Sequence, residues 1–350
     1  MIPALHPRLE TIRPRLIAGG VVAAVLAVVL GWRQPSAIVP AYQLAVFVCL
    51  APAVGSLFFA LVHRCTGGHW GETLAPFLAA GSRLAPWIWL GVAPLLFFQH
   101  HATASWPHYD SEPMLALRTA LYAVILFALT LPVGRRPAAF AFWLGPVGLI
   151  VLLFTFHLLA DDWLAALEPG WDSTAFPLVW MLGQSVSGLG CAVLAVVLLG
   201  LNPSATGRGS RPVGLDWGNL LLTALLLWCY VMFAQFLIIW GGNLPRETSW
   251  FEHRLHGAWA AVPWLLLAFH FIVPLFILLS RRFKQSARSL GFVAAILVAA
   301  QVLFLTWVIV PAFPANGGVT VLLGVALAGA GAAFFIERYL VFSTRQPNRP

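Results

Sequence analysis

The chain has 350 residues, of which 60% are hydrophobic and only 9% are charged. An ordinary globular domain carries roughly a quarter charged residues, so this composition excludes a soluble domain. The formal net charge is +8, which would suit a nucleic-acid-binding protein, and the positions of the basic residues decide whether that reading holds.

Ten apolar runs of about 20 residues follow one another along the chain. A helix rises about 1.5 Å per residue and the hydrocarbon core of a bilayer is about 30 Å thick, so each run can cross it. Backbone groups find no partner in lipid, and the runs lack the alternation of barrel strands, so we expect helices. The sequence therefore predicts an all-α integral membrane protein, a single polytopic domain over residues 1–350. The ten predicted spans are about 16–32, 40–62, 84–104, 113–133, 137–160, 174–201, 216–241, 257–280, 289–311 and 318–341.

The basic residues are unevenly distributed between the two sides of these spans. If the N-terminus is cytoplasmic, 16 of the 20 Lys and Arg residues fall on cytoplasmic loops and tails, and only Arg33, Arg118, Arg246 and Arg254 fall on the outer half. This bias is the positive-inside rule, and it predicts a multi-pass protein with both termini cytoplasmic. It also excludes nucleic acid as the reason for the positive charge. The first span follows a short basic leader without a small-residue cleavage site, so we expect it to remain as an anchor.

Some segments are interpreted as packing or interfacial elements. Residues 71–83, before the third span, are expected to lie along the membrane interface. The four cysteines have no metal-like or haem-attachment spacing, so we interpret them as small packing residues and expect no metal site. Gly324, Ala328 and Ala332 lie on one stripe of the last span, which is expected to pack closely on the first helix or on a neighbouring subunit.

Polar residues are predicted to gather at the outer ends of the third, fourth and fifth spans. These residues are Gln99, Arg118, His157, Asp161 and Asp162. His157 and Asp161 are four residues apart, so they share a helix face and can form a hydrogen bond. Short loops bring antiparallel neighbours together, so we expect one polar mouth on the outer side. Two interpretations stay open: a satisfied polar rim, or a site where a histidine beside a carboxylate exchanges protons.

A second polar set falls near mid-depth in the sixth to ninth spans. It consists of Gln184, Ser187, Tyr230, His270 and Gln301. Such side chains usually face other helices and form hydrogen bonds between them. The alternative is a hydrated relay, in which His270 would be the titratable group.

The corner after the seventh span resembles a membrane helix leaving the lipid. Its residues include Asn243, Arg246, Glu247 and Trp250. A Trp-rich helix end followed by a charged turn is typical of the interface. We expect this corner to dock a partner on the outer side.

Four stretches of the chain together resemble one protein family. The stretches are Arg118 with Tyr122; Asp162-Trp163 with Leu167-Glu168-Pro169-Gly170-Trp171-Asp172-Ser173-Thr174; Gln235, Phe236, Ile238 and Trp240 with Asn243-Leu244-Pro245-Arg246-Glu247-Thr248; and His270-Phe271 with Pro274, Ser280-Arg281 and Lys284. They are similar to the ActF subunit of bacterial alternative complex III, a quinol:electron-acceptor oxidoreductase whose membrane subunits are NrfD/PsrC-like. The resemblance covers roughly residues 110–311. The N-terminal third matches poorly, and Gly241-Gly242 stands where bulkier residues are expected.

The resemblance implies ten helices, with the second to fifth and the sixth to ninth spans as two four-helix bundles and two peripheral helices. It also implies a bacterial inner-membrane location and a non-catalytic subunit without a redox centre of its own. Its roles would be structural and, as is proposed for the family, proton-conducting. The implied partners are an ActC-like quinol-oxidising subunit, an iron–sulfur protein and haem c proteins, and these partners would carry the iron–sulfur clusters and the haem c.

Two alternatives stay open at this stage. In the first, this subunit itself binds quinol at the polar mouth, and His157 or Asp161 accepts the proton. In the second, the protein is a stand-alone secondary transporter, although the sequence has no Gly/Pro-interrupted spans in matching positions. We assign no catalytic residue from the sequence.

Overall fold

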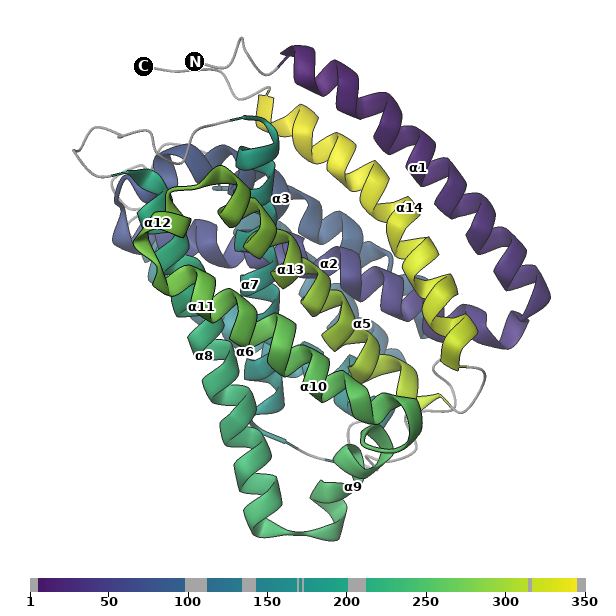
Figure 1. Ribbon diagram of the computed structural model, residues 1–350. Helices are drawn as coiled ribbons and strands as arrows, with labels where there is room; N and C mark the ends of the chain where they lie inside the picture. Colours follow the sequence, from purple (N-terminus) through teal and green to yellow (C-terminus); the bar gives the residue numbers. More distant parts are fainter. Residues whose placement is uncertain are drawn as a thin grey trace.

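The computed structural model describes residues 6–97, 112–133, 143–168, 170–171, 173–200, 212–313 and 317–344. The elements in these ranges are helices, drawn in Figure 1. Nine helical stretches in the described residues are long and apolar enough to cross a membrane. The expectation of an all-α integral membrane protein is therefore confirmed. The long helices are α1 (His6–Arg33), α2 (Ile38–Thr66), α3 (Trp70–Leu90), α5 (Glu112–Thr130), α6 (Leu144–Trp163), α7 (Phe176–Leu198), α8 (Val213–Gly242), α13 (Ala287–Ile309) and α14 (Gly317–Thr344).

The eighth predicted span is divided among several short helical elements. It begins with the 3-10 helix η6 (Gly257–Ala261) and α10 (Val262–Leu266), passes through the π-helix η7 (Leu267–Ile272), and ends with α11 (Val273–Leu279). A π-helical turn inside an α-helix widens the backbone locally and is frequent at functional sites. The shorter helices elsewhere are η2 (Pro35–Ala37), α4 (Ala93–Leu96), η5 (Ala165–Leu167), α9 (Pro245–Arg254), α12 (Arg281–Lys284) and η8 (Val310–Ala312).

The third predicted span is placed wrongly by the sequence. Helix α3 begins at Trp70, 14 residues before the predicted start at 84, and it is not one of the nine candidate spans. Residues 71–83 form its first half and bury Leu74, Phe77 and Leu78, so they do not lie along the interface as a separate segment. Glu72, Pro76 and Arg83 lower the hydropathy of this stretch and conceal the helix from an apolar-run search, whereas its small residues allow it to pack against α2.

The inner helices make contacts in two closed rings. Helix α2 packs against α3 and α6, and α5 contacts both α3 and α6. Helix α7 packs against α8 and α13, and α11 contacts both α8 and α13. These contacts favour the predicted division into two four-helix bundles, which stays a prediction. Helices α2 and α7 join the two rings (Figure 1).

The crossing of α2 and α7 depends on two glycines. A Cβ atom added to Gly55 would overlap the carbonyl group of Gln184 and approach the amide of Gly188. One added to Gly188 would overlap the backbone of Gly55 and Ser56. The two backbones therefore touch directly, which only glycine permits.

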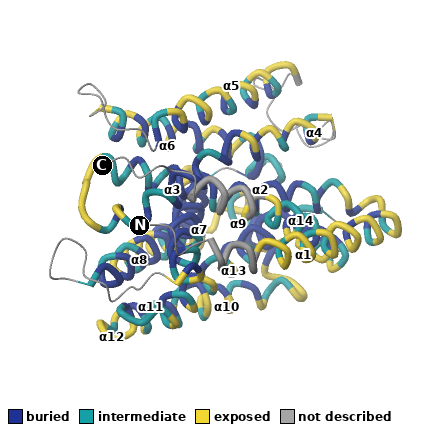
Figure 2. Tube along the Cα trace, turned by 90° about the horizontal axis from the view of Figure 1, so that it is seen from above, coloured by how far each residue is buried: buried dark blue, intermediate teal, exposed yellow. Residues whose placement is uncertain are grey.

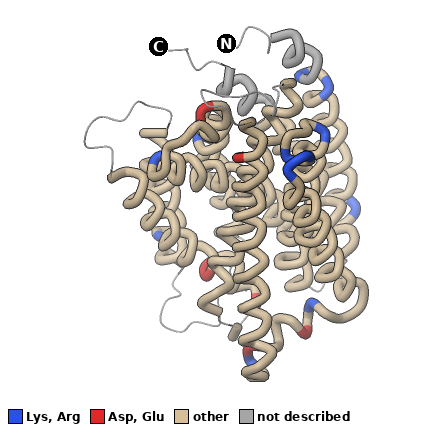
Figure 3. The backbone as a smooth tube through the Cα atoms, turned by 60° about the vertical axis from the view of Figure 1, so that its left-hand side comes forward, with Lys and Arg blue, Asp and Glu red and all other residues tan. Residues whose placement is uncertain are grey.

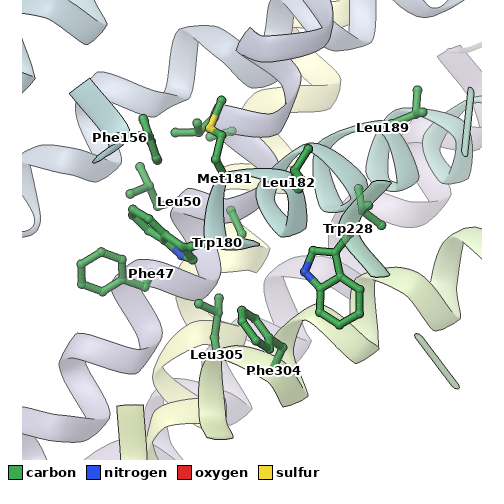
Figure 4. Close-up of a cluster of buried hydrophobic side chains, with 14 of the residues drawn as sticks. Phe47, Leu50, Phe156, Trp180, Met181, Leu182, Leu189, Trp228, Phe304 and Leu305 are labelled. Carbon is green, nitrogen blue, oxygen red and sulfur yellow. The ribbon is translucent and has the colours of Figure 1, made fainter. Parts of the chain in front are cut away.

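An aromatic and aliphatic cluster fills the core beside this crossing. Figure 4 shows Trp180 of α7 between Phe47 of α2 and Phe156 of α6, with ring centroids 5.7 and 5.1 Å apart. Trp228 of α8 meets Phe304 of α13 at 5.6 Å. This cluster links both rings of helices in one large apolar core, and a smaller separate cluster lies where α1, α2 and α14 meet.

Helices α1 and α14 pack against each other at the side of the molecule (Figure 2). Gly20 of α1 faces Ala333, and Gly329 faces Ala23. The predicted stripe makes a different contact, because Gly324 packs on Ala41 and Leu44 of α2. The close-packing stripe of α14 thus serves α2, while a neighbouring face of the same helix holds α1.

The two ends of the molecule differ in charge. We call the end at which α1 begins and α14 ends the terminal end, and the opposite end, which carries α9, the α9 end (Figure 1). Most of the Lys and Arg positions coloured in Figure 3 lie towards the terminal end. This asymmetry agrees with the distribution that the sequence predicts.

Candidate functional site

A partly buried triad of polar side chains joins α5 to α6 near the α9 end. Arg118 Nε donates to Asp162 Oδ2 at 2.9 Å, and Arg118 Nη2 donates to Asp162 Oδ1 at 2.8 Å. Tyr122 Oη donates to the same Oδ2 at 2.7 Å. A bidentate arginine and a phenol occupy both carboxylate oxygens, which is among the strongest arrangements for a carboxylate in a protein. The side chain of Asp162 is therefore held in one position by three hydrogen bonds.

Trp89 and Gln43 hold the backbone around the triad. Trp89 of α3 donates its indole N–H to the carbonyl of Thr119 at 2.9 Å, and its ring meets Tyr122 edge-on. Gln43 of α2 donates to the carbonyl of Trp163 at 3.0 Å. The triad is thereby fixed by all four helices of the first ring.

The second pair, His157 and Asp161, lies on another face of α6. His157 Nε2 is 3.6 Å from Asp161 Oδ2, and the two side chains are 44% and 49% exposed. The same helix face carries Phe154, which is 70% exposed, and Leu158. A polar pair on an apolar, membrane-facing surface is costly unless a partner, a ligand or water covers it. Both side chains are therefore accessible on this face of α6, unlike those of Arg118 and Asp162.

The structure therefore divides the predicted polar mouth. Arg118 and Asp162 form one unit, and His157 and Asp161 form another. Gln99 lies outside the described residues. The adjacent residues Asp161 and Asp162 have different roles because successive helix positions point about 100° apart.

A second ionic cluster closes the α9 end. Glu168, in the connection between α6 and α7, accepts from Arg254 Nη1 at 3.1 Å and lies 2.7 Å from Nδ1 of His253. Arg254 is fully buried and also donates to the carbonyls of Trp250 and Val308. One arginine thus connects α9, the α6–α7 connection and the end of α13.

Burial lowers the pKa of Arg254 to about 10 from 12.5, and the hydrogen bond and charge of Glu168 act in the opposite direction. Desolvation disfavours the charged form of a base, and a nearby carboxylate favours it. Arg254 belongs to α9 and lies outside the candidate spans. At neutral pH it is protonated, and Glu168 is its charged partner.

Aromatic rings surround this ion pair. Trp250 and Trp171 stack with centroids 5.1 Å apart, and the guanidinium of Arg254 lies 4.2 Å above the ring of Trp250. Trp307 meets Trp250 edge-on and donates to the carbonyl of Arg254. A cation over an indole face gains about 2 kcal/mol when it is desolvated.

The predicted docking corner is therefore only partly available to a partner. Trp250 is 1% exposed and serves as the centre of this aromatic cluster, so it cannot be a docking residue. Arg246 donates to the carbonyl of Gly170, and the carbonyl of Glu247 accepts from Trp171. Asn243 is exposed and ends α8 in the left-handed conformation, with φ at 46°. The sequence showed a typical interfacial Trp but not that α9 folds back on its own chain.

The mid-depth set is also divided. Gln184, Ser187, His270 and Gln301 are buried, whereas Tyr230 is 69% exposed and faces away from them. His270 stacks on Trp228 with centroids 4.0 Å apart, and neither of its ring nitrogens has a hydrogen-bond partner within the described chain. The side-chain atoms of Gln184 and Gln301 also lack partners there. Buried polar groups in proteins usually have a hydrogen-bond partner, so His270, Gln184 and Gln301 stand out within the described core.

Two of these contacts escaped sequence reasoning. The pairing of Glu168 with Arg254 and the stacking of Trp228 on His270 link residues 86 and 42 positions apart. The sequence did give one signal for the Glu168–Arg254 pair, because Arg254 is one of the few basic residues expected on the outer half. Its partner could not be deduced, because Glu168 lies in a different connection, between α6 and α7.

No group of three or more His, Cys, Asp or Glu within the described part of the chain is placed to hold a metal ion. Comparison of the sequence with models of known protein families finds no match, and comparison with curated proteins finds none either.

Proposed function

We propose that this protein is an integral membrane subunit of a quinol:electron-acceptor oxidoreductase of the alternative complex III type, with structural and proton-conducting roles and no redox centre of its own. Its α9 end faces the outer side of a bacterial inner membrane, and both termini are cytoplasmic. An ActC-like subunit, an iron–sulfur protein and haem c proteins are its partners.

One observation carries this proposal: stretches that resemble the ActF family are far apart in the sequence but touch in space. Arg118 and Tyr122 meet Asp162 of the second stretch. The indole N–H of Trp171, in the second stretch, donates to the backbone carbonyl of Glu247, in the third stretch. Residues that act together in a family motif are expected to lie together, so these contacts support the resemblance.

The geometry also favours a supporting role over catalysis by this chain alone. Asp162 and Glu168 are both engaged in fixed ion pairs that tie helices and connections together. Fixed pairs give rigidity and a defined outer surface, which a subunit needs when partners dock on it.

The second candidate function is quinol binding at the exposed pair. His157 and Asp161 lie on the membrane-facing side of α6 beside Phe154 and Leu158, where a hydroquinone could donate a proton while its ring contacts apolar side chains. The third, a stand-alone transporter, has no structural observation in its favour.

Extraction in mild detergent tests the proposal. We expect the chain to co-purify with polypeptides that show haem c absorption bands, although this chain has no haem-attachment motif. Isolation as a solitary protein that moves a solute in liposomes would refute it.

Substitution of the exposed pair separates the first two functions. His157→Gln and Asp161→Asn should leave assembly and quinol oxidation intact and reduce charge translocation if the chain conducts protons. A collapse of quinol affinity in an assembled complex would instead assign the quinol site to this subunit. The matched control is Glu252→Gln, which removes one charge from an exposed position on α9.

A further inference from the structure

A cluster of exposed arginines lies at the terminal end, on the turn between α11 and α13. It consists of Arg281 and Arg282 of α12 and Arg288 in the first turn of α13, and we call it the basic ledge. All three side chains are exposed. The first turn of α13 holds no acidic residue that would neutralise them.

Lys284 in the same turn has a different role. Its ammonium donates to Asn219 Oδ1 of α8 at 2.6 Å, and its stem lies against Gly218. A Cβ atom at position 218 would collide with that stem. Lys284 is therefore buried and fastens α12 to α8, so the ledge is presented on a fixed turn.

Exposed apolar side chains lead from the membrane-spanning part of the molecule to the ledge. Phe276 and Leu279 lie one turn apart on α11, Phe283 lies on α12 beyond the extended residue Ser280, and all three are exposed. On α13, Phe292 is exposed one turn after Arg288. Helices α11 and α12 both contact α13, so these exposed apolar side chains and the arginines are carried by neighbouring helices.

This combination matches the two halves of a phospholipid. Arginine binds phosphate oxygens through its planar fork of donors, and basic residues next to a bilayer attract anionic headgroups. Acyl chains pack against apolar side chains of the spans. A free phosphate ion would use the arginines alone and would leave the aromatic side chains without a role.

We propose that the basic ledge binds the headgroup of an anionic phospholipid whose acyl chains lie along Phe276, Leu279, Phe283 and Phe292. The site is independent of the quinol-related function and lies at the opposite end of the molecule from the α9 cluster. A bound lipid would fill the surface between α11 and α13.

Lipid titration of the purified full chain in a zwitterionic detergent tests this site. Binding of diphosphatidylglycerol and of phosphatidylcholine is measured by native mass spectrometry and by the shift in melting temperature. We expect the anionic lipid to bind and the zwitterionic lipid not to. Arg281→Gln/Arg282→Gln should weaken the anionic lipid about thirtyfold, since each basic residue beside a membrane is worth about 1 kcal/mol.

The matched control is Arg13→Gln/Arg15→Gln, which removes the same charge from exposed positions of α1 in the half nearer the terminal end. It should change the affinity less than threefold. An equal loss in both double variants would show diffuse charge attraction and overturn the site.

Two further measurements separate a lipid from a free anion. Phe276→Ala/Phe283→Ala should weaken diphosphatidylglycerol severalfold without unfolding the protein, because both side chains are exposed. Inorganic phosphate at millimolar concentration should not displace the lipid. Displacement by phosphate together with no effect of the phenylalanine variant would show a free-anion site and refute the proposal.

Discussion

The substitution Glu168→Gln removes the charged partner of the fully buried Arg254 while preserving the shape of the side chain. Removing one partner of a buried ion pair is destabilising by about 3–5 kcal/mol, because the other charge is left uncompensated. Arg254 keeps the carbonyls of Trp250 and Val308 as acceptors, and glutamine still offers an amide oxygen, so we expect the lower limit, about 3 kcal/mol.

The effect should be local to α9, because Arg254 fastens this helix to the α6–α7 connection and to α13. Hydrogen exchange of the backbone amides of residues 246–254 measures the opening of α9 directly. A loss of about 3 kcal/mol corresponds to roughly hundredfold faster exchange, since each 1.4 kcal/mol is a factor of ten. Amides in α2 and α7 should exchange at the wild-type rate.

Glu252→Gln provides the control, because Glu252 is an exposed residue on the same helix and its carboxylate accepts a hydrogen bond from Thr248. An exposed contact of this kind contributes less than about 1 kcal/mol, so exchange should change by less than about fivefold. Equal acceleration in the two variants would show that the Glu168–Arg254 pair does not hold α9 and would refute the reasoning.

Three other predictions concern protonation, helix crossing and the triad. Burial lowers the pKa of Arg254 to about 10, so between about pH 10 and the unfolded-chain value of 12.5 the unfolded chain binds more protons, and the cost of burying the charge falls as pH rises. The difference in melting temperature between Glu168→Gln and wild type should therefore be smaller at pH 10.5 than at pH 7.5. A difference that stays constant between these two pH values would contradict this. Gly55→Ala should abolish accumulation of folded protein, because the added Cβ would overlap the backbone of α7. Gly241→Ala is the control, because its added Cβ meets no atom within 4 Å, and it should melt at or above the wild-type temperature. A normal yield of Gly55→Ala in detergent extracts would disprove the direct contact between α2 and α7. Asp162→Asn should destabilise the fold by about 3 kcal/mol because Arg118 loses its counter-charge, and Tyr122→Phe by about 1 kcal/mol because one hydrogen bond is lost. Thermal unfolding of the purified variants measures both losses. A larger loss in Tyr122→Phe than in Asp162→Asn would show that the phenol rather than the arginine secures the carboxylate.

The membrane class and the long helices could be predicted from the sequence because they depend on local chemistry. A run of about 20 apolar residues has no alternative to a helix in lipid, whatever its neighbours are. The same reasoning found α2, α8 and α13 with boundaries close to those observed, whereas α1 begins at His6, well before its predicted start at 16. It failed for α3, where Glu72, Pro76 and Arg83 interrupt the apolar run although packing on α2 keeps the helix intact.

The candidate site was predicted as a set of residues but not as a geometry. The sequence identified Arg118, Asp161 and Asp162, yet only the packing of α5 against α6 decided that Asp162 is enclosed by Arg118 and Tyr122 while Asp161 is exposed beside His157. Trp250 likewise has the composition of an interfacial anchor, and the tertiary structure buries it.

The sequence by itself thus determined that the chain is helical and lies in a membrane, because the free energy of placing backbone and apolar side chains in lipid is fixed by local composition. The tertiary structure alone decided which polar groups neutralise one another and which stay accessible. Such pairings join residues up to 86 positions apart and depend on helix rotation, which no local pattern in this chain specifies.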